Sequence, residues 1–201
     1  MVTDLTSLPR AKPLVVLGGT FDPPHIGHLI IADDLYAWAE PSAVVFVPAA
    51  VPPHKIGERH APPPARLEMA TRAVADDARF TVAALEIERG GVSYTIDTVR
   101  ALRGRGFADV RVAVGADNLA EVTAWREWEA LVKECRLVVM TRPGYGDDVP
   151  AALAGKVEQL AVTPVPLSSS LVRARVAAAK PFRYLVPTPV YEYIIAEGLY
   201  R

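Results

Sequence analysis

Residues 17–29 read Leu17-Gly18-Gly19-Thr20-Phe21-Asp22-Pro23-Pro24-His25-Ile26-Gly27-His28-Leu29. They follow an apolar run, Leu14–Leu17, that is typical of a buried parallel strand, and they lead into a helix-like segment that begins at Leu29. A glycine-rich turn and two histidines therefore stand where a first strand passes into a first helix. In open α/β sheets, ligands bind outside the carboxyl ends of the strands, and a helix N-terminus at that edge attracts anions.

Strand-like and helix-like segments alternate along the rest of the chain. Apolar runs predict further strands at Ala43–Val47, Phe80–Ile87, Val110–Val114, Leu137–Thr141 and Glu158–Val162. Apolar residues at helical spacing predict helices within Arg66–Val74, Thr95–Arg103 and Val190–Ile195. Such alternation is typical of a parallel sheet with helices on both faces. We therefore expect an α/β fold with a Rossmann-like, doubly wound parallel sheet in a single domain.

The composition sets limits on size and partners. The chain has 201 residues, about half of them hydrophobic, and a formal net charge of −1, so we expect one domain and no nucleic-acid partner. No run of about 18 apolar residues is present, so we expect no membrane span. We expect residues 1–13 to be a loosely ordered leader, not a secretory signal, and residues 14–201 to form the domain. The single cysteine, Cys135, fits a cytoplasmic location.

Two proline- and glycine-containing stretches interrupt the alternation, Pro48–Pro64 and Arg142–Asp148. Loops of this length in compact domains are usually functional or disordered. The first carries His54, Lys55 and His60. We therefore expect it to be a mobile loop that contacts substrate.

The glycine-rich turn is neither a Walker A loop nor a G-x-G-x-x-G fingerprint. Gly18 and Gly19 allow a ligand to approach the backbone, and His25 and His28 can present both imidazoles to one phosphate chain. Gly27 between them leaves room for a base or a phosphate. A plain tight turn and a metal site are the alternatives, but no third His, Cys or carboxylate stands nearby at a metal-site spacing. The strand–turn–helix context favours a phosphate site.

The string from Gly18 to His28 looks like the H-x-G-H signature of the nucleotidyltransferase superfamily. With further motifs in the family's order, it closely resembles bacterial nicotinate-nucleotide adenylyltransferases over roughly residues 14–200. The further motifs are Val51–Lys55, Gly91–Thr98, Gly115–Asp117, Trp125, Arg142–Gly144, Ser168–Arg173, Tyr184–Pro187 and Gly198–Tyr200. The first motif is specific to the superfamily, and the later motifs together are specific to the family.

This resemblance implies adenylyl transfer from ATP to nicotinate mononucleotide, which gives deamido-NAD and pyrophosphate, a step of NAD biosynthesis. The 5′-phosphate of the mononucleotide would attack the α-phosphorus of ATP in line, with no covalent intermediate. Catalysis would then rest on positioning and charge stabilisation. We expect Mg²⁺ to accompany ATP, although no protein ligand set for it is visible. ATP and nicotinate mononucleotide are the expected partners, and a homo-oligomer is left open.

The resemblance also implies roles for individual residues, with His25, His28 and Arg173 expected to be catalytic. The expected ATP contacts are Gly18, Gly19, Thr20, Phe21, His25, Gly27, His28, Gly115, Asp117, Ser168, Ser169, Ser170 and Arg173. Ser170 and Val172 replace the Thr and Ile of the family pattern Ser-Ser-Thr-x-Ile-Arg. Taken without the resemblance, the residues leave open a helix cap at Ser168 or Ser169 before an Ala-rich helix at 174–179, and a surface charge at Arg173.

The expected contacts with nicotinate mononucleotide are Lys55, Thr98, Trp125 and Arg142. Trp125 can stack on the pyridine ring, and Asp117 can accept hydrogen bonds from ribose hydroxyls. The residues alone leave open a core position for Trp125, a solvated charge at Lys55 and a helix N-cap at Asp117.

Three other functions stay open at this point. One is an adenylyltransferase that prefers nicotinamide mononucleotide, because the choice between acid and amide depends on a few hydrogen-bond donors. Another is a different H-x-G-H transferase, such as phosphopantetheine adenylyltransferase or an enzyme that uses a cytidine nucleotide; Tyr94–Thr98 and Tyr184–Pro187 argue against it. The third is a nucleotide-binding regulator without catalysis, against which the two histidines, the serines and Arg173 argue.

Overall fold

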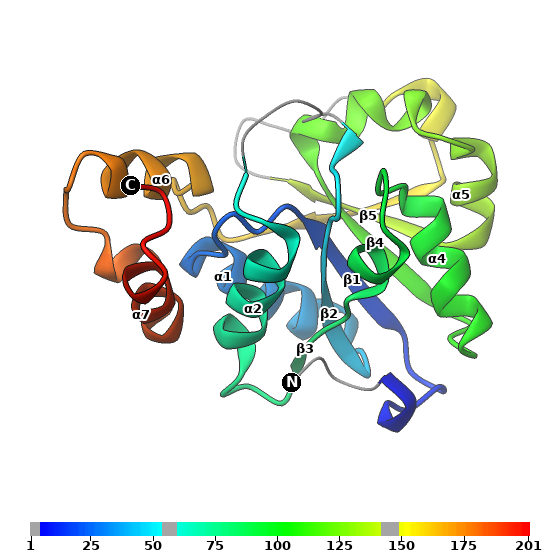
Figure 1. The fold of residues 1–201 in the computed structure, drawn as a ribbon. Coiled ribbons are helices and arrows are strands. Elements are labelled where there is room, and N and C mark those ends of the chain that lie inside the picture. The colour runs from blue at the N-terminus through cyan, green and yellow to red at the C-terminus, as the bar shows by residue number, and fades with distance from the viewer. Residues whose placement is uncertain (1–4, 54–59, 142–148) are drawn as a thin grey trace.

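A parallel sheet of six strands forms the centre of the molecule (Figure 1). The computed structural model describes residues 5–53, 60–141 and 149–201. Every adjacent pair of strands is parallel, in the order β3-β2-β1-β4-β5-β6. The strands are β1 (Leu14–Gly19), β2 (Ala43–Pro48), β3 (Phe80–Val82), β4 (Val110–Gly115), β5 (Arg136–Thr141) and β6 (Val157–Ala161).

Helices connect the strands and cover both faces of the sheet. The α-helices are α1 (Ile26–Ala39), α2 (Pro63–Val74), α3 (Leu85–Arg89), α4 (Thr95–Gly104), α5 (Trp128–Glu134), α6 (Ser169–Ala177) and α7 (Thr188–Ala196). The 3-10 helices are η1 (Leu5–Ser7), η3 (Ala116–Ala124), η4 (Ala151–Leu153) and η5 (Arg183–Leu185). Figure 1 shows α1 and α2 on one side of the sheet, α4 and α5 on the other, and α6 and α7 beyond α1 and α2. No helix in the described ranges is long and apolar enough to cross a membrane.

The central strand β1 marks the place where the strand order reverses. Leu14 is in register with Ala43 of β2 on one side and with Val110 of β4 on the other. In doubly wound sheets, the crevice at the carboxyl ends of two such strands is the ligand site. The predicted α/β fold, with a Rossmann-like, doubly wound parallel sheet in a single domain, is confirmed.

Side chains of β1 alternate between two apolar cores. Val16 packs with residues of α4 and η3 on one face, whereas Val15 and Leu17 pack with residues of α1 and α2 on the other. All three are at most 4% exposed, and burial of each such side chain contributes about 1.5–3 kcal/mol. The apolar run that predicts this strand therefore forms the central wall between the two cores.

A third core holds the C-terminal helices against the domain. Met69 of α2 packs with Val172 of α6 and with Val190 and Ile194 of α7. These four residues are fully buried. This packing brings α6 and the end of the chain beside the turn that follows β1.

The strand predicted at Phe80–Ile87 is wrong for more than half of its length. The run Phe80–Ile87 is strand only as far as Val82, and Leu85 to Arg89 form α3. The last backbone bond to β2 in this run is from the N–H of Ala83 to the carbonyl of Phe46, at 3.0 Å. A short apolar run fits a buried helix as well as a strand, and here Leu85 and Glu86 are the buried residues of the helix.

The described part of the N-terminal leader packs on the domain. Leu5 is 5% exposed and belongs to the core on the α4 side. Arg10 donates to the carbonyls of Leu5 and Leu8, and its guanidinium lies 3.9 Å from the centroid of the Phe107 ring. Leu5 and Arg10 thus connect the described part of this segment to the domain, whereas the loosely ordered leader over residues 1–13 stays a prediction.

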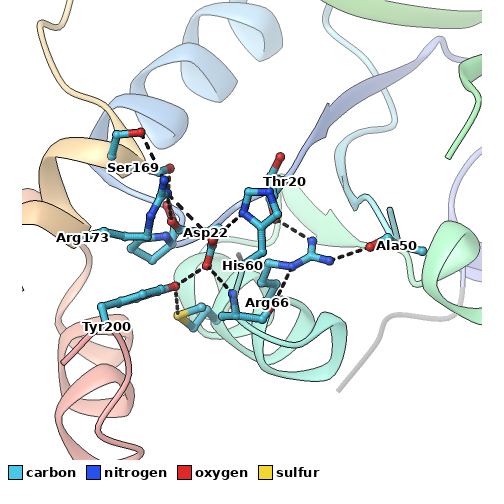
Figure 2. A network of polar contacts seen from close by, with 12 residues as sticks. Thr20, Asp22, Ala50, His60, Arg66, Ser169, Arg173 and Tyr200 are labelled. Carbon is cyan, nitrogen blue, oxygen red and sulfur yellow. Dashed lines mark hydrogen bonds and ion pairs between the residues drawn. The ribbon is translucent and has the colours of Figure 1, made fainter. Parts of the chain in front are cut away.

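A buried arginine of α2 connects three loops at the carboxyl edge of the sheet. Arg66 is 1% exposed. Its guanidinium donates to the carbonyls of Thr20, Ala50 and Ala61 at 2.8, 2.9 and 3.0 Å (Figure 2). Thr20 follows β1 and Ala50 follows β2, so a single side chain sets the spacing of the loops that follow both strands.

Replacing this side chain should destabilise the fold severely. Arg66→Ala removes all three bonds and leaves three buried carbonyls without this donor, so we expect a loss of roughly 3–5 kcal/mol in the free energy of unfolding. The matched control is Arg72→Ala on the same helix, because Arg72 is 41% exposed, with an ion pair to Glu68 and a ring contact to Tyr193; there we expect about 1 kcal/mol or less. Urea denaturation of both variants measures the difference, and equal losses would contradict this role of Arg66.

Candidate active site

The glycine-rich turn, residues 18–28, lies at the carboxyl edge of the sheet between β1 and α1. Phe21 adopts a positive φ of 49° and is 2% exposed, with its ring against Phe46 and edge-on to His28. A Cβ at position 19 would come within 3.1 Å of the Phe21 ring, so a larger residue there would crowd that ring. The Phe21 side chain is buried, whereas Gly18 is exposed and Gly19 and Thr20 are partly exposed.

His25 and His28 stack on each other where α1 begins. Their ring centroids are 3.8 Å apart with an angle of 27° between the planes. The backbone N–H of His25 donates to Nδ1 of His28 at 3.1 Å. Nδ1 of His28 is therefore unprotonated, and its proton is on Nε2. Burial, and then the charge of His25, lower the pKa of His28 well below its ordinary value, so His28 acts as a neutral N–H donor.

The end of β4 lies beside the turn that follows β1, because the two strands are neighbours in the sheet. A Cβ at position 115 would collide with Oδ1 of Asp117, which means that the Asp117 carboxylate folds back over Gly115. Asp117 is exposed, and the N-cap residue of η3 is Gly115. The alternative role of Asp117 as a helix N-cap is thus excluded, and its carboxylate faces the outside at a strand end.

Helix α6 brings a third group of predicted residues to the turn. The helix begins at Ser169, with the Ser168 side chain as its cap, so the expected helix at 174–179 starts five residues early. Ser169 donates to the carbonyl of Pro23 at 2.8 Å, and Arg173 donates to the carbonyl of Asp22 at 2.7 Å (Figure 2). Arg173 also donates to Oγ of Ser170. Arg173 is therefore not an isolated surface charge.

A separate small cavity lies between the start of α4 and the end of η3. It has a volume of about 180 Å³ and is lined by Pro53, Ser93, Tyr94, Thr95, Ala124, Trp125 and Arg126. Trp125 is partly buried, and its Nε1 is a buried donor with no hydrogen-bond partner among the residues that the structure describes. The guanidinium of Arg126 lies 4.8 Å from the centroid of the Tyr94 ring. The predicted residue Trp125 thus lines a cavity, with one edge still packed against the core.

Thr98 does not line this cavity. Its side chain is 2% exposed and donates to Oε1 of Glu86 at 2.5 Å. Burial raises the pKa of Glu86, and the bond from Thr98 opposes that shift. Thr98 therefore supports α4 from within, and the residue of this helix that lines the cavity is Thr95. Thr95 is the first residue of α4, where backbone N–H groups have no intrahelical partners. That position is the sequence signal that points to Thr95 as a binding residue.

Two predicted contacts, Lys55 and Arg142, lie outside the described residues. The sequence predicts no individual role for Asp22, Arg66 or Tyr200 and includes His60 only in the expected substrate loop, yet the structure brings all four to the turn. Asp22 lies inside the decisive stretch and Tyr200 inside a quoted motif. Their pairing is not visible in the sequence, because the residues come from opposite ends of the chain.

The fold and the site together define a nucleotidyltransferase of the H-x-G-H type. A family model described as cytidylyltransferase-like matches residues 16–175. Most of the parallel sheet, the histidine pair at the start of α1, and Ser169 and Arg173 of α6 lie within that match.

Curated relatives narrow this class. A Roseiflexus protein named "Probable nicotinate-nucleotide adenylyltransferase" is 41% identical over 197 residues, which cover 95% of this chain and 99% of the relative. A Thermus thermophilus protein of the same name is 42% identical over 189 residues, which cover 92% and 98%. The chain belongs to the nicotinate-nucleotide adenylyltransferase family.

Solved structures agree on the fold. The Plasmodium falciparum nicotinic acid mononucleotide adenylyltransferase, solved in complex with NaAD, superposes with a TM-score of 0.75 at 17% identity. The match covers 94% of this chain and 97% of that one.

The lowered pKa of His28 predicts a specific pH dependence of stability. In the unfolded chain His28 takes up a proton near its ordinary pKa of 6.5, whereas the folded protein resists protonation. The unfolded state then binds more protons, so stability is lost as the pH falls below about 6.5. We expect the wild type to lose more stability than His28→Asn between pH 7 and pH 5 in urea titrations. Parallel curves for the two proteins would contradict the assignment of a neutral His28.

Proposed function

We propose that the protein transfers the adenylyl group of ATP to nicotinate mononucleotide and releases pyrophosphate, forming deamido-NAD in NAD biosynthesis. The observation that carries the proposal is the meeting of the histidine pair, the turn after β1 and Arg173 of α6 at the reversal point of the sheet. Family membership supports the same reaction.

We expect the phosphates of the substrates to bind along the turn of residues 18–28. His25 and His28 stand at the start of α1, where the helix dipole and the first backbone N–H groups favour negative charge. With Nδ1 of His28 engaged by the His25 backbone, its Nε2–H is the donor left for a phosphate oxygen. Gly18, Gly19, Thr20, Phe21 and Gly27 would contribute backbone and space for close approach. In-line attack on the α-phosphorus needs little beyond such positioning and charge stabilisation.

The remaining ATP contacts lie on two sides of the turn. Ser168, Ser169, Ser170 and Arg173 at the start of α6 suit the β- and γ-phosphates, which leave as pyrophosphate. Gly115 and Asp117 at the end of β4 suit the ribose, because an exposed carboxylate at a strand end can accept bonds from hydroxyl groups.

The cavity at α4 suits the pyridine end of the mononucleotide. Trp125 offers a ring for stacking, and the N-terminus of α4 offers backbone N–H groups that favour negative charge. The guanidinium of Arg126 also lines the cavity, although it pairs with Asp97 at 3.5 Å and Glu127 at 3.6 Å. A carboxylate gains more from such an environment than an amide does, which favours nicotinate over nicotinamide mononucleotide. Lys55 and Arg142 remain predicted contacts of this substrate, and Thr98 would support the cavity through α4.

A magnesium ion would accompany ATP. No group of three or more His, Cys, Asp or Glu side chains placed to hold a metal occurs in the part of the chain that the structure describes. Asp22, the carboxylate of the turn, already accepts bonds from His60, Ala61 and Tyr200. Magnesium is commonly held by substrate phosphates and waters with few protein ligands, and this site fits that arrangement. When bound, the ion would neutralise charge on the leaving pyrophosphate.

A substrate panel tests the proposal. Pyrophosphate release is measured with ATP, Mg²⁺ and one acceptor at a time: nicotinate mononucleotide, nicotinamide mononucleotide or phosphopantetheine. We expect the highest kcat/KM with nicotinate mononucleotide, with deamido-NAD as the product identified by mass. Turnover with another acceptor and none with nicotinate mononucleotide would refute the proposal.

His28→Asn provides the matched control for this assay. The Asn oxygen can replace Nδ1 as acceptor for the His25 N–H, whereas the Nε2–H donor is lost. We expect kcat to fall by about 10² to 10³, the usual effect of losing one such donor, with folding retained. Full activity in this variant would place the reaction elsewhere.

A further inference from the structure

The carboxylate of Asp22 is the meeting point of three distant parts of the chain. It accepts hydrogen bonds from Nδ1 of His60 at 2.9 Å, from the N–H of Ala61 at 3.2 Å and from the hydroxyl of Tyr200 at 2.6 Å. Figure 2 shows the ring of Tyr200 pointing at Asp22 from the side opposite Arg66. The three donors come from the segment before α2 and from the end of the chain, while Asp22 itself lies in the turn after β1.

The shape of the C-terminus delivers the Tyr200 hydroxyl to this point. Gly198, two residues after the end of α7, has a φ of 60°, a backbone conformation that glycine adopts at low cost. The N–H of Leu199 bonds back to the carbonyl of Ile194, which turns the chain towards the domain. Burial raises the pKa of Tyr200, as does its bond to Asp22, so the phenol stays neutral and donates.

Asp22 is in turn connected to Arg173. The guanidinium donates from one nitrogen to the Asp22 carbonyl at 2.7 Å, and the same nitrogen lies 3.8 Å from the carboxylate. The other terminal nitrogen donates to Ser170. The side chain is still 27% exposed, and it borders a cavity of about 530 Å³ that His60, Ser170 and Tyr200 also line. The nitrogen that bonds to Asp22 is therefore anchored on the turn, while the exposed part of the Arg173 guanidinium is available to a ligand.

These contacts connect Tyr200 at the C-terminus, through Asp22, to Arg173, which is proposed to bind phosphate. An aspartate that is 1% exposed must be fully hydrogen-bonded to remain charged. Without the Tyr200 hydroxyl, the carboxylate loses a strong donor and its position is less well fixed. A carboxylate that moves carries the Asp22 backbone and the anchored nitrogen of Arg173 with it.

We propose that Tyr200 is a positioning residue for adenylyl transfer: its hydroxyl fixes the Asp22 carboxylate, and through it the turn and the guanidinium of Arg173. This inference rests on the proposed function. Tyr200 touches no reacting atom, so its effect should be seen in kcat and in the KM for ATP. The KM for nicotinate mononucleotide should not change, because the α4 cavity has no contact with Tyr200 in its lining.

The test compares Tyr200→Phe with wild type under single-turnover conditions. The Phe ring keeps the packing and removes only the hydroxyl, so we expect kcat/KM for ATP to fall about 10- to 100-fold, the size of losing a bond to a charged group. Tyr193→Phe is the matched control, since Tyr193 lies on α7 with its ring beside Arg72, 4.9 Å away; we expect it to change kcat/KM less than twofold.

A double-mutant cycle separates positioning from stability. If Tyr200 acts through Arg173, then Tyr200→Phe should lower kcat/KM for ATP less than about threefold in an Arg173→Ala background. A wild-type rate in Tyr200→Phe with only a lower Tm would overturn the proposal, as would full additivity with Arg173→Ala.

Two further controls allow the result for Tyr200 to be interpreted. If Tyr200→Phe fails to fold, Asp22→Asn replaces it in the same cycle, with the same expected loss and the same non-additivity. The wild type alone tests the proposed function, because absence of turnover with nicotinate mononucleotide refutes that function. If the wild type turns over and Tyr200→Phe is equally active, only the role of Tyr200 is refuted.

Discussion

The need to stabilise a buried carboxylate organises this molecule. Asp22 is 1% exposed, and a charge in that position is tolerated only if donors and opposite charge surround it. The structure draws them from the segment before α2, from α6 and from the C-terminus. Arg66 is the complementary buried cation: burial lowers its pKa, and the nearby Asp22 opposes that shift. The turn after β1 therefore takes its shape from parts of the chain that lie far from it in sequence.

This arrangement explains why the site is divided between rigid elements. The sheet provides the reversal point between β1 and β4, beside which the histidine pair stacks at the start of α1 and Asp117 is exposed. The third core holds α6 against α2, so Arg173 reaches the same edge from outside the sheet. In the proposed function, the α4 cavity lined by Trp125 and Arg126 takes the pyridine ring and its negative group. The proposal thus draws on several elements for the nucleotidyl-transfer site, and no single element supplies it.

Local pattern was enough to predict the sheet, because buried parallel strands are continuous apolar runs; the predicted cores of β1, β2, β4, β5 and β6 are all strands in the structure. The same rule failed at Phe80–Ile87, where a short apolar run includes a helix. The histidine pair was recognisable because both partners lie within one turn. The partnership of Tyr200 with Asp22, 178 residues apart, has no local signature. Thr98 was assigned to substrate from a motif, but its side chain points inward.

A crystal structure of the protein with deamido-NAD bound tests the central claim most directly. We expect the pyrophosphate of the dinucleotide on the turn of residues 18–28, within hydrogen-bond distance of Nε2 of His28. We also expect the pyridine ring against Trp125, with its carboxylate at the start of α4. A dinucleotide bound with its phosphates away from the histidine pair, or with its pyridine ring outside the α4 cavity, would contradict it.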